Sequence, residues 1–381
     1  MAGIYIHIPF CKQACHYCDF HFSTSVKYKD EMILAIIKEL DIQKEYLGNQ
    51  TVETIYFGGG TPSLLSGDEV SLIIEAIQTR FKLSDSPEIT LEANPDDLDL
   101  QKLRAFKNTL INRFSIGVQS FFDEDLKWMN RAHQANEAES AIKRAQDFGF
   151  ENITIDLIYG FLLLSDQKWE QNIIKAIDFQ IPHISSYGLT VEPKTALAKF
   201  IQTEKQIPLD EGQSAHQFQM LMQTLVSAGF DHYEISNFAK PNHYSKHNTN
   251  YWKGVHYLGI GPSAHSFNGK SRQWNLPNNA KYLADLALNK IPFEMEILSL
   301  NDQFNEYIMT SLRTMWGIDL NKVAIDFDPI MKTKLLASAD KYLSKDWLAL
   351  ADHKLILTPK GKLYADLIAS ELFITENEFQ K

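Results

Sequence analysis

The three cysteines of this chain, Cys11, Cys15 and Cys18, stand close together as C-x3-C-x2-C in a sequence of 381 residues. They directly follow residues 4–8, an apolar segment whose alternation is typical of a strand. Three thiolates supply protein sulfur to only three irons of a four-iron four-sulfur cluster, so one iron stays open to a ligand from outside. The spacing therefore predicts a metal centre with an open coordination position.

The spacing gives less support to two other roles of the cysteines, a zinc site and a disulfide framework. A zinc knuckle would take His16, Asp19 or His21 as its fourth ligand, but structural zinc sites usually close with paired two-residue spacings from two segments. The sequence has no second pair of cysteines. A disulfide framework does not suit an odd number of closely spaced cysteines in a long chain. Both alternatives rank below an iron–sulfur cluster.

The cysteine motif resembles that of the radical S-adenosylmethionine (SAM) superfamily. The wider string YIHIPFC, residues 5–11, is similar to the branch that contains the oxygen-independent coproporphyrinogen III oxidases and their relatives, the heme chaperones. This resemblance implies a 4Fe-4S cluster whose open iron is chelated by the methionine amino and carboxyl groups of SAM. It also implies reductive cleavage of SAM to a deoxyadenosyl radical.

Short β-branched segments alternate with longer stretches of helical periodicity in the first part of the chain. The expected strands are residues 4–8, 52–57, 89–92, 114–118, 153–158 and 183–189, and the expected crossover helices include residues 30–46, 68–81, 137–148 and 169–179. Six βα units predict parallel strands. Because a closed TIM barrel needs eight such units, we expect an α/β fold with an open, partial (β/α)6 TIM-like barrel and ligands at the C-terminal ends of its strands.

The sequence suggests three parts. Residues 1–235 form the expected barrel, and residues 236–290 form a connecting region without a long helical period, which contains the HNTNYW segment as a loop. Residues 291–381 carry expected helices and a short LILT strand, and they resemble the small C-terminal winged-helix-like domain of the branch. Winged helices often bind DNA, but a fold alone does not carry that function over.

Polar residues follow several of the expected strands, where a ligand of the barrel should lie. The turn GGGTP at residues 58–62 lets a ligand touch the backbone, and a carboxylate at the end of a half-buried strand needs a cation or hydroxyl partner. Taken singly, each of these polar residues could equally be a side chain at the barrel rim whose hydrogen bonds are all made within the protein. Carried over from the branch, the SAM-contacting positions are Tyr5, Gly59, Gly60, Thr61, Glu92, Gln119, Arg131 and Asp156, with Tyr17 next to the cluster.

The HNTNYW segment, residues 247–252, matches the H-N-x-x-Y-W pattern that marks the heme chaperones of the branch. A heme carrier needs an axial ligand, for which histidine is common and tyrosine is an alternative. We expect His247 first, with His243 and Tyr251 in reserve, and Trp252 could stack on the porphyrin. The plainer alternative is that these side chains bond their own backbone and pack on the barrel rim.

Two features separate a carrier from an enzyme. The oxidases carry a fourth cysteine, C-x3-C-x2-C-x-C, where this chain has Phe20, and an N-terminal extension ahead of the first strand. We therefore expect a heme chaperone that binds heme and a SAM-ligated 4Fe-4S cluster and transfers heme to an acceptor, by family analogy a respiratory cytochrome, membrane-bound or not. The alternative is an oxygen-independent coproporphyrinogen III oxidase, which decarboxylates its substrate by radical SAM chemistry in porphyrin biosynthesis.

The charge and the apolar segments limit the partners. A formal net charge of −11 and the lack of a basic stripe disfavour nucleic acid. The longest apolar run, LIYGFLLL, is too short to span a membrane. The first residues, MAGIYIHIPF, lack the features of a secretory signal. We therefore expect a cytoplasmic protein without a membrane span, in a reducing compartment that suits free thiolates.

Overall fold

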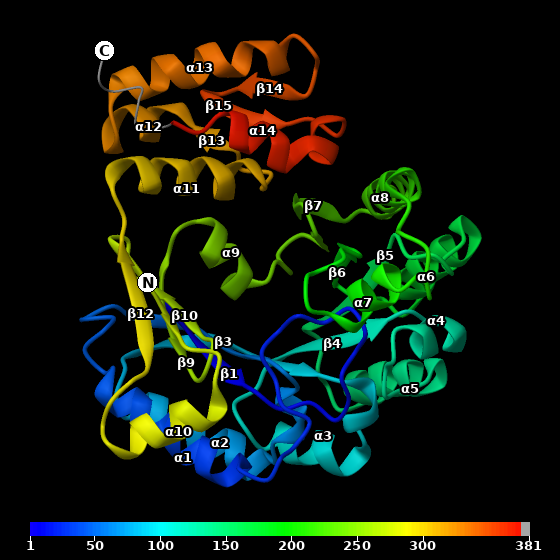
Figure 1. Ribbon diagram of the computed structural model, residues 1–381, viewed down its shortest axis with the longest axis vertical. Helices are drawn as coiled ribbons and strands as arrows, with labels where there is room; N and C mark the ends of the chain where they lie inside the picture. Colours follow the sequence, from blue (N-terminus) through cyan, green and yellow to red (C-terminus); the bar gives the residue numbers. More distant parts are fainter. Residues whose placement is uncertain (375–381) are drawn as a thin grey trace.

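A computed structural model describes residues 1–374 and centres on one 12-stranded sheet that does not close on itself (Figure 1). Its middle consists of six strands that follow one another in chain order and pair in parallel. These strands are β1 (Ala2–Ile8), β2 (Val52–Gly59), β3 (Leu83–Ala93), β4 (Arg113–Gln119), β5 (Ile153–Tyr159) and β6 (His183–Gly188). The predicted open, partial (β/α)6 barrel is thus confirmed.

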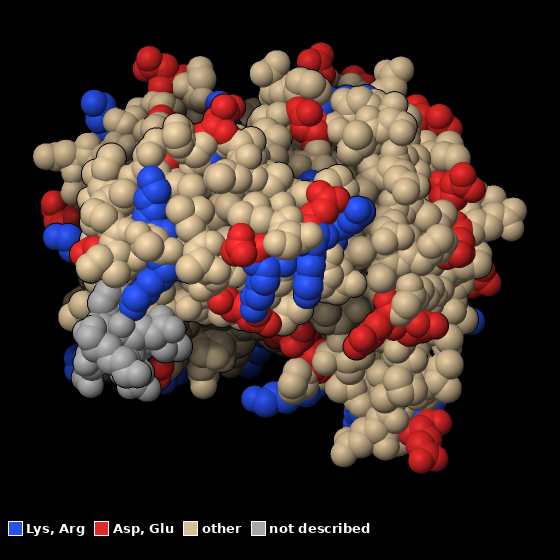
Figure 2. Space-filling model, turned by 90° about the horizontal axis from the view of Figure 1, so that it is seen from above, with Lys and Arg blue, Asp and Glu red and all other residues tan. Residues whose placement is uncertain are grey.

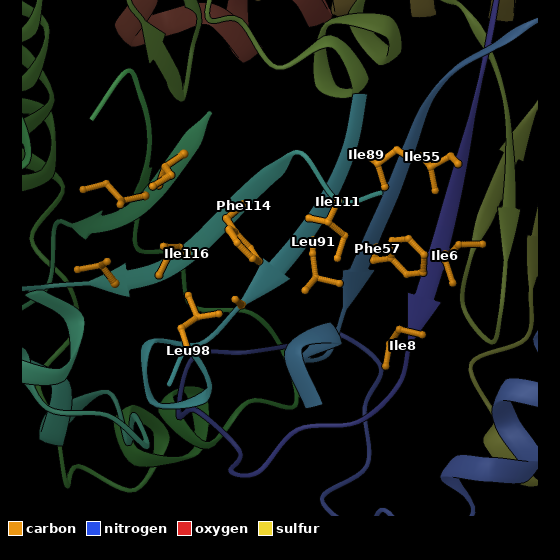
Figure 3. Packing of buried hydrophobic residues seen from close by; sticks show 14 of the residues in the cluster. Ile6, Ile8, Ile55, Phe57, Ile89, Leu91, Leu98, Ile111, Phe114 and Ile116 are labelled. Atoms are coloured by element: carbon orange, nitrogen blue, oxygen red, sulfur yellow. The ribbon is translucent and has the colours of Figure 1, made fainter. Parts of the chain in front are cut away.

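Helices cover the outer face of these strands. Figure 1 shows them on one side of the sheet, as crossover connections of right-handed βα units require. They include α1 (Lys29–Ile42), α2 (Gly67–Gln78), α3 (Leu100–Lys107), α4 (Asp123–Trp128), α5 (Ala135–Asp147), α6 (Asp166–Asp178) and α8 (Glu211–Ser227). The short helix α7 (Ala196–Gln202) instead lies beside the residues of the cysteine motif, where the N–H of Leu197 donates to the carbonyl of His16 at 2.8 Å. Buried side chains of neighbouring strands, such as Ile6, Phe57, Leu91 and Phe114, line up in one continuous apolar layer (Figure 3). Burial on both faces explains why these strands carry long apolar runs.

Additional strands extend both edges of the sheet. On one edge, residues 231–239 form a hairpin of β7 (Asp231–Glu234) and β8 (Asn237–Ala239), whose second strand pairs antiparallel with β6. On the other edge, β9 (His256–Ile260) runs parallel to β1, followed by β10 (His265–Phe267), β11 (Ser271–Asn275) and β12 (Phe293–Ile297) in antiparallel order. The helix α10 (Asn279–Ala287) connects the last two. Much of the expected connecting region is therefore part of the main sheet.

The HNTNYW segment differs from its prediction, because it is a short helix and not a loop. The helix α9 (Lys246–Trp252) begins after Ser245, whose hydroxyl accepts a hydrogen bond from the backbone N–H of Asn248 at 3.3 Å. Such an N-cap satisfies one of the free donors of a helix end. Seven residues are too few for helical periodicity to stand out in a sequence.

The C-terminal part has a hydrophobic core and a three-stranded antiparallel sheet of its own. Its first six elements, in the order helix, strand, helix, helix, strand and strand, confirm the winged-helix-like prediction, and a last helix follows them. The elements are α11 (Leu300–Leu312), β13 (Ile318–Asp319), α12 (Leu320–Asp326), α13 (Pro329–Leu343), β14 (Leu348–Ala351), β15 (Lys354–Leu357) and α14 (Ala365–Glu371).

Figure 2 shows basic side chains interspersed with acidic ones on the face seen from above. Within residues 1–374, no helix is both long enough and apolar enough to cross a membrane.

Candidate functional site

A cavity of about 430 Å³ opens at the C-terminal ends of the parallel strands, beside the cysteine segment. Its walls bring together residues that lie far apart in the sequence. They include all three cysteines and eight of the other expected site residues: Tyr17, Gly59, Gly60, Thr61, Glu92, Gln119, Arg131 and Asp156. Two expected site residues, Tyr5 and His247, are not among its walls.

The cysteine segment, residues 9–28, connects β1 to α1 and is held by backbone hydrogen bonds at Cys11 and at His16. The N–H of Cys11 donates to the carbonyl of Ser23 at 3.0 Å, and the N–H of His16 donates to the carbonyl of Met129 at 3.0 Å. The three thiols are free and half-buried. They are therefore available as ligands on one wall of the cavity.

Two side chains of the barrel point hydrogen-bond donors at these sulfurs. The hydroxyl of Thr61 donates to Sγ of Cys11 at 3.4 Å, and the guanidinium of Arg131 donates to Sγ of Cys15 at 3.5 Å. Donors of this kind stabilise thiolates, the form that binds iron. Burial acts in the opposite direction and raises the pKa of Cys18 to about 12, so iron binding must displace a proton from this thiol.

The geometry gives no support to the zinc alternative. Within residues 1–374, no group of three or more His, Cys, Asp or Glu side chains is arranged to hold a single metal ion. Nδ1 of His16 bonds the carbonyl of Trp128 at 2.9 Å, and Nε2 of His21 bonds the side chain of Asn279 at 2.7 Å. Thiols that share a cavity without converging on one point suit a cluster, in which each sulfur binds a different iron.

Two carboxylates face the cavity from β3 and β5. Glu92 accepts a hydrogen bond from the hydroxyl of Tyr56 at 2.8 Å. Burial raises the pKa of Glu92 to about 7, and the nearby Asp156 carboxylate adds to the shift. Burial likewise raises the pKa of Asp156 to about 6. Such carboxylates favour a ligand that brings hydroxyl donors or a positive charge into the cavity.

Arg131 is at the centre of a hydrogen-bond network that connects the ends of β2, β3 and β4. Its guanidinium donates to the side-chain oxygen of Asn94 at 2.8 Å and to the carbonyl of Gly117 at 2.9 Å. The amide of Asn94 in turn donates to the hydroxyl of Thr61 at 3.4 Å. Nε of Arg131 is buried without a hydrogen-bond partner among the described residues, so it is a donor left for a ligand. Sequence reasoning missed Asn94, although it stands two residues after Glu92 at the same strand end.

The glycine turn after β2 has a structural role as well as a place in the cavity wall. A Cβ added at Gly60 would lie 2.5 Å from the carbonyl oxygen of Phe10 and 2.7 Å from that of Ile8. The N–H of Gly60 donates to the carbonyl of Ile8 at 2.9 Å. The turn is therefore packed directly against the start of the cysteine segment.

We expect Gly60→Ala to destabilise the protein by about 1–3 kcal/mol and to lower its iron content, because the clash is with backbone that leads into Cys11. Gly48→Ala is the matched control, since nothing lies within 4 Å of a Cβ added there; its cost should be about 1 kcal/mol or less, from its positive φ. Urea unfolding and iron analysis measure both. An iron content and a stability equal to the wild type in Gly60→Ala would contradict the packing argument.

The candidate heme ligands of the α9 segment lie apart from this cavity. His247 is only 2% exposed; Nδ1 bonds the hydroxyl of Thr54 at 2.7 Å and Nε2 bonds the hydroxyl of Tyr251 at 2.8 Å. Burial lowers the pKa of His247 to about 3. Both ring nitrogens are thus occupied, and ligation by His247, which stays a prediction, requires one of these bonds to break. The backbone N–H of His243 donates to the carbonyl of Lys240 at 2.9 Å. The N–H of Lys240 in turn donates to the carbonyl of Pro182, just before β6, so His243 lies near the β7–β8 edge of the sheet and far from the β9–β12 edge.

Comparisons with known proteins agree with this arrangement. Residues 5–174 match the family model of the radical SAM superfamily, and residues 298–364 match that of the HemN C-terminal domain. Heme chaperone HemW of Bacillus subtilis (strain 168) is 33% identical over 370 residues, covering 95% of this chain and 97% of the relative. Heme chaperone HemW of Mycobacterium tuberculosis is 31% identical over 375 residues, covering 97% and 94%. A solved structure of coproporphyrinogen III oxidase (HemN) from Escherichia coli has a TM-score of 0.85 at 21% identity, covering 98% of this chain and 90% of that one, which shows a shared fold.

Proposed function

Because this chain belongs to the heme chaperone HemW family of the radical SAM superfamily, we propose that it binds heme and passes it to an acceptor protein. The observation that carries this proposal is the similarity to proteins named heme chaperones over nearly the whole of both chains. The exposed side chain of Phe20, at the position where we expect a cysteine in the oxidases, also favours a carrier.

We infer that Cys11, Cys15 and Cys18 hold a 4Fe-4S cluster and that the adjacent walls hold SAM. When bound, the cluster would pass one electron from an external low-potential reductant to SAM. The Gly59–Gly60 backbone and Thr61 border the ligand, while Glu92 and Asp156 accept hydrogen bonds from its hydroxyl or ammonium donors. Arg131 offers its unpartnered Nε, and Gln119 and Tyr17 complete the wall on the cluster side.

The affinity for SAM should depend on pH through Glu92. Burial raises its pKa to about 7, so a ligand that needs the charged carboxylate must expel a proton below that pH. We expect the affinity of the cluster-loaded protein to fall about tenfold from pH 8 to pH 6. Glu92→Gln should bind more weakly but with a flatter pH profile. Calorimetry under anaerobic conditions measures both, and an equally steep profile in Glu92→Gln would exclude Glu92 as the source.

Two experiments test the carrier function itself. Purified protein should bind hemin at about one per chain, with a Soret band shifted from that of free heme by protein ligation. The heme-loaded protein should transfer its heme to an apo-cytochrome of the respiratory type, in line with a role in the cytoplasm beside such acceptors. Failure to bind hemin would overturn the proposal. Anaerobic turnover of coproporphyrinogen III with SAM and a low-potential reductant would support the oxidase instead.

A further inference from the structure

A second cavity, of about 750 Å³, lies where the edge of the main sheet meets the C-terminal domain. One wall comes from β1, β9, β10, β11 and the end of α9, and the other comes from α11 and α12. Asp19 and Phe20 line both this cavity and the one beside the cysteines, so the two spaces adjoin. Its volume lies within the range of about 300–1,000 Å³ that is typical of cofactor sites.

Aromatic side chains from both walls face this space, which we call the interdomain cavity. On the sheet side, Tyr251 and Tyr257 pack edge to face with their ring centroids 4.6 Å apart. On the side of the C-terminal domain, Tyr307 and Phe327 lie 5.9 Å apart. Flat apolar molecules bind well between aromatic rings contributed from two sides. The walls therefore suit a large planar ligand such as a porphyrin.

Cations line the same cavity and suit a ligand with carboxylates at its edge. Arg272 forms a 2.9 Å ion pair with Glu306, and Lys322 pairs with Asp326. Lys253 has no carboxylate partner in the described part of the chain, and its ammonium lies 4.4 Å from the ring centroid of Trp316. The propionates of heme would find an unpaired ammonium at Lys253.

One histidine of the interdomain cavity has both of its ring nitrogens free to bind a metal. His265 on β10 is exposed, its ring stacks on Trp274 with centroids 6.2 Å apart, and neither of its nitrogens has a hydrogen-bond partner within residues 1–374. By contrast, both ring nitrogens of His7 are occupied, by the hydroxyl of Tyr5 at 3.2 Å and by the carbonyl of His21 at 2.9 Å. His21 bonds Asn279 through Nε2 and keeps only Nδ1 without a partner among the described residues. Imidazole nitrogen is the commonest protein ligand of heme iron.

We propose that the interdomain cavity is the heme site and that His265 is its axial ligand, an inference that rests on the proposed heme-carrying function. Tyr251 and Trp252 of the HNTNYW segment then form part of the wall, and His247 is a positioning residue that holds Tyr251 through their 2.8 Å hydrogen bond. Because both walls contact the ligand, separation of the C-terminal domain from the sheet edge would expose heme for transfer.

Hemin titration of four full-length proteins tests this site: the wild type, His265→Ala, His247→Ala and the control His243→Ala, whose exposed histidine lies at the opposite edge of the sheet. His265→Ala should raise the dissociation constant by about tenfold or more, because even outer-shell partners of metal ligands are worth about 10–100-fold. Its Soret band and spin state should change, and added imidazole should restore both by filling the empty position. His243→Ala should match the wild type.

A fifth protein tests the cavity separately from the identity of the axial histidine. Thr310 on α11 lines the interdomain cavity, so Thr310→Trp should weaken hemin binding by filling the space while leaving the iron of the cluster in place. Hemin binding by the wild type with unchanged spectra in His265→Ala would overturn the ligand assignment, as would imidazole rescue of His247→Ala alone. Undiminished affinity in Thr310→Trp would overturn the cavity. A wild type that binds no hemin would overturn the proposed function itself.

Discussion

Single replacement of Cys11, Cys15 or Cys18 by alanine should abolish the four-iron cluster. Each thiol is expected to bind a different iron, and no other cysteine exists in the chain to replace the one lost. The three thiols stand on one wall of the same cavity, so each loss removes a ligand without filling the space. Anaerobic reconstitution followed by iron and sulfide analysis and by the visible absorption of the cluster measures the effect.

Thr61→Val is the matched control for the cysteine variants. It removes the hydroxyl that donates to Cys11 at 3.4 Å but keeps the side-chain volume and all three thiols. We expect a full cluster in this variant, with at most a small change in its reduction potential, since hydrogen bonds to the sulfurs tune potentials. A full complement of iron in any single cysteine variant would mean that another side chain is a ligand.

Glu39→Ala should destabilise the whole barrel. This carboxylate is fully buried on α1, and it accepts hydrogen bonds from the N–H of Gly261 at 2.8 Å, from the side-chain amide of Asn275 at 2.7 Å and from the hydroxyl of Tyr282 at 2.5 Å. Alanine would leave three buried donors without an acceptor. We expect a loss of about 3–5 kcal/mol in the free energy of unfolding, measured with urea.

The same residue should give the stability a pH dependence. Burial raises the pKa of Glu39 to about 7 in the folded state, above the 4.5 of an exposed glutamate. Its contribution is therefore fully present below the unfolded pKa and is lost as the pH rises from about 4.5 to 7. Glu39→Gln should flatten this part of the profile, and Glu31→Ala, on the exposed face of α1, should change the stability by only about 0.5 kcal/mol. A wild-type stability that rises between pH 5 and pH 7, with no difference in Glu39→Gln, would contradict the assignment.

The local pattern of the sequence determined much of the barrel. Apolar runs such as residues 114–118 and 153–158 are strands because their side chains are buried on both faces, and no bound of the observed β4 and β5 differs from the expected one by more than one residue. The polar residues that follow these runs could be expected to share one cavity, because parallel strands end at the same edge. Cys11, Glu92 and Asp156, from distant parts of the sequence, do line one cavity.

Only the tertiary structure decided what surrounds the HNTNYW segment. By itself the sequence determined that a histidine and two aromatic residues lie near one another. The hydrogen bond between His247 and Tyr251 forms because the segment is helical, and the one between His247 and Thr54 depends on how α9 packs against β2. The free nitrogens of His265 and the walls of the interdomain cavity likewise depend on contacts between segments that are tens of residues apart. Periodicity reports which face of an element is apolar, whereas the partner of each polar atom is set by long-range packing.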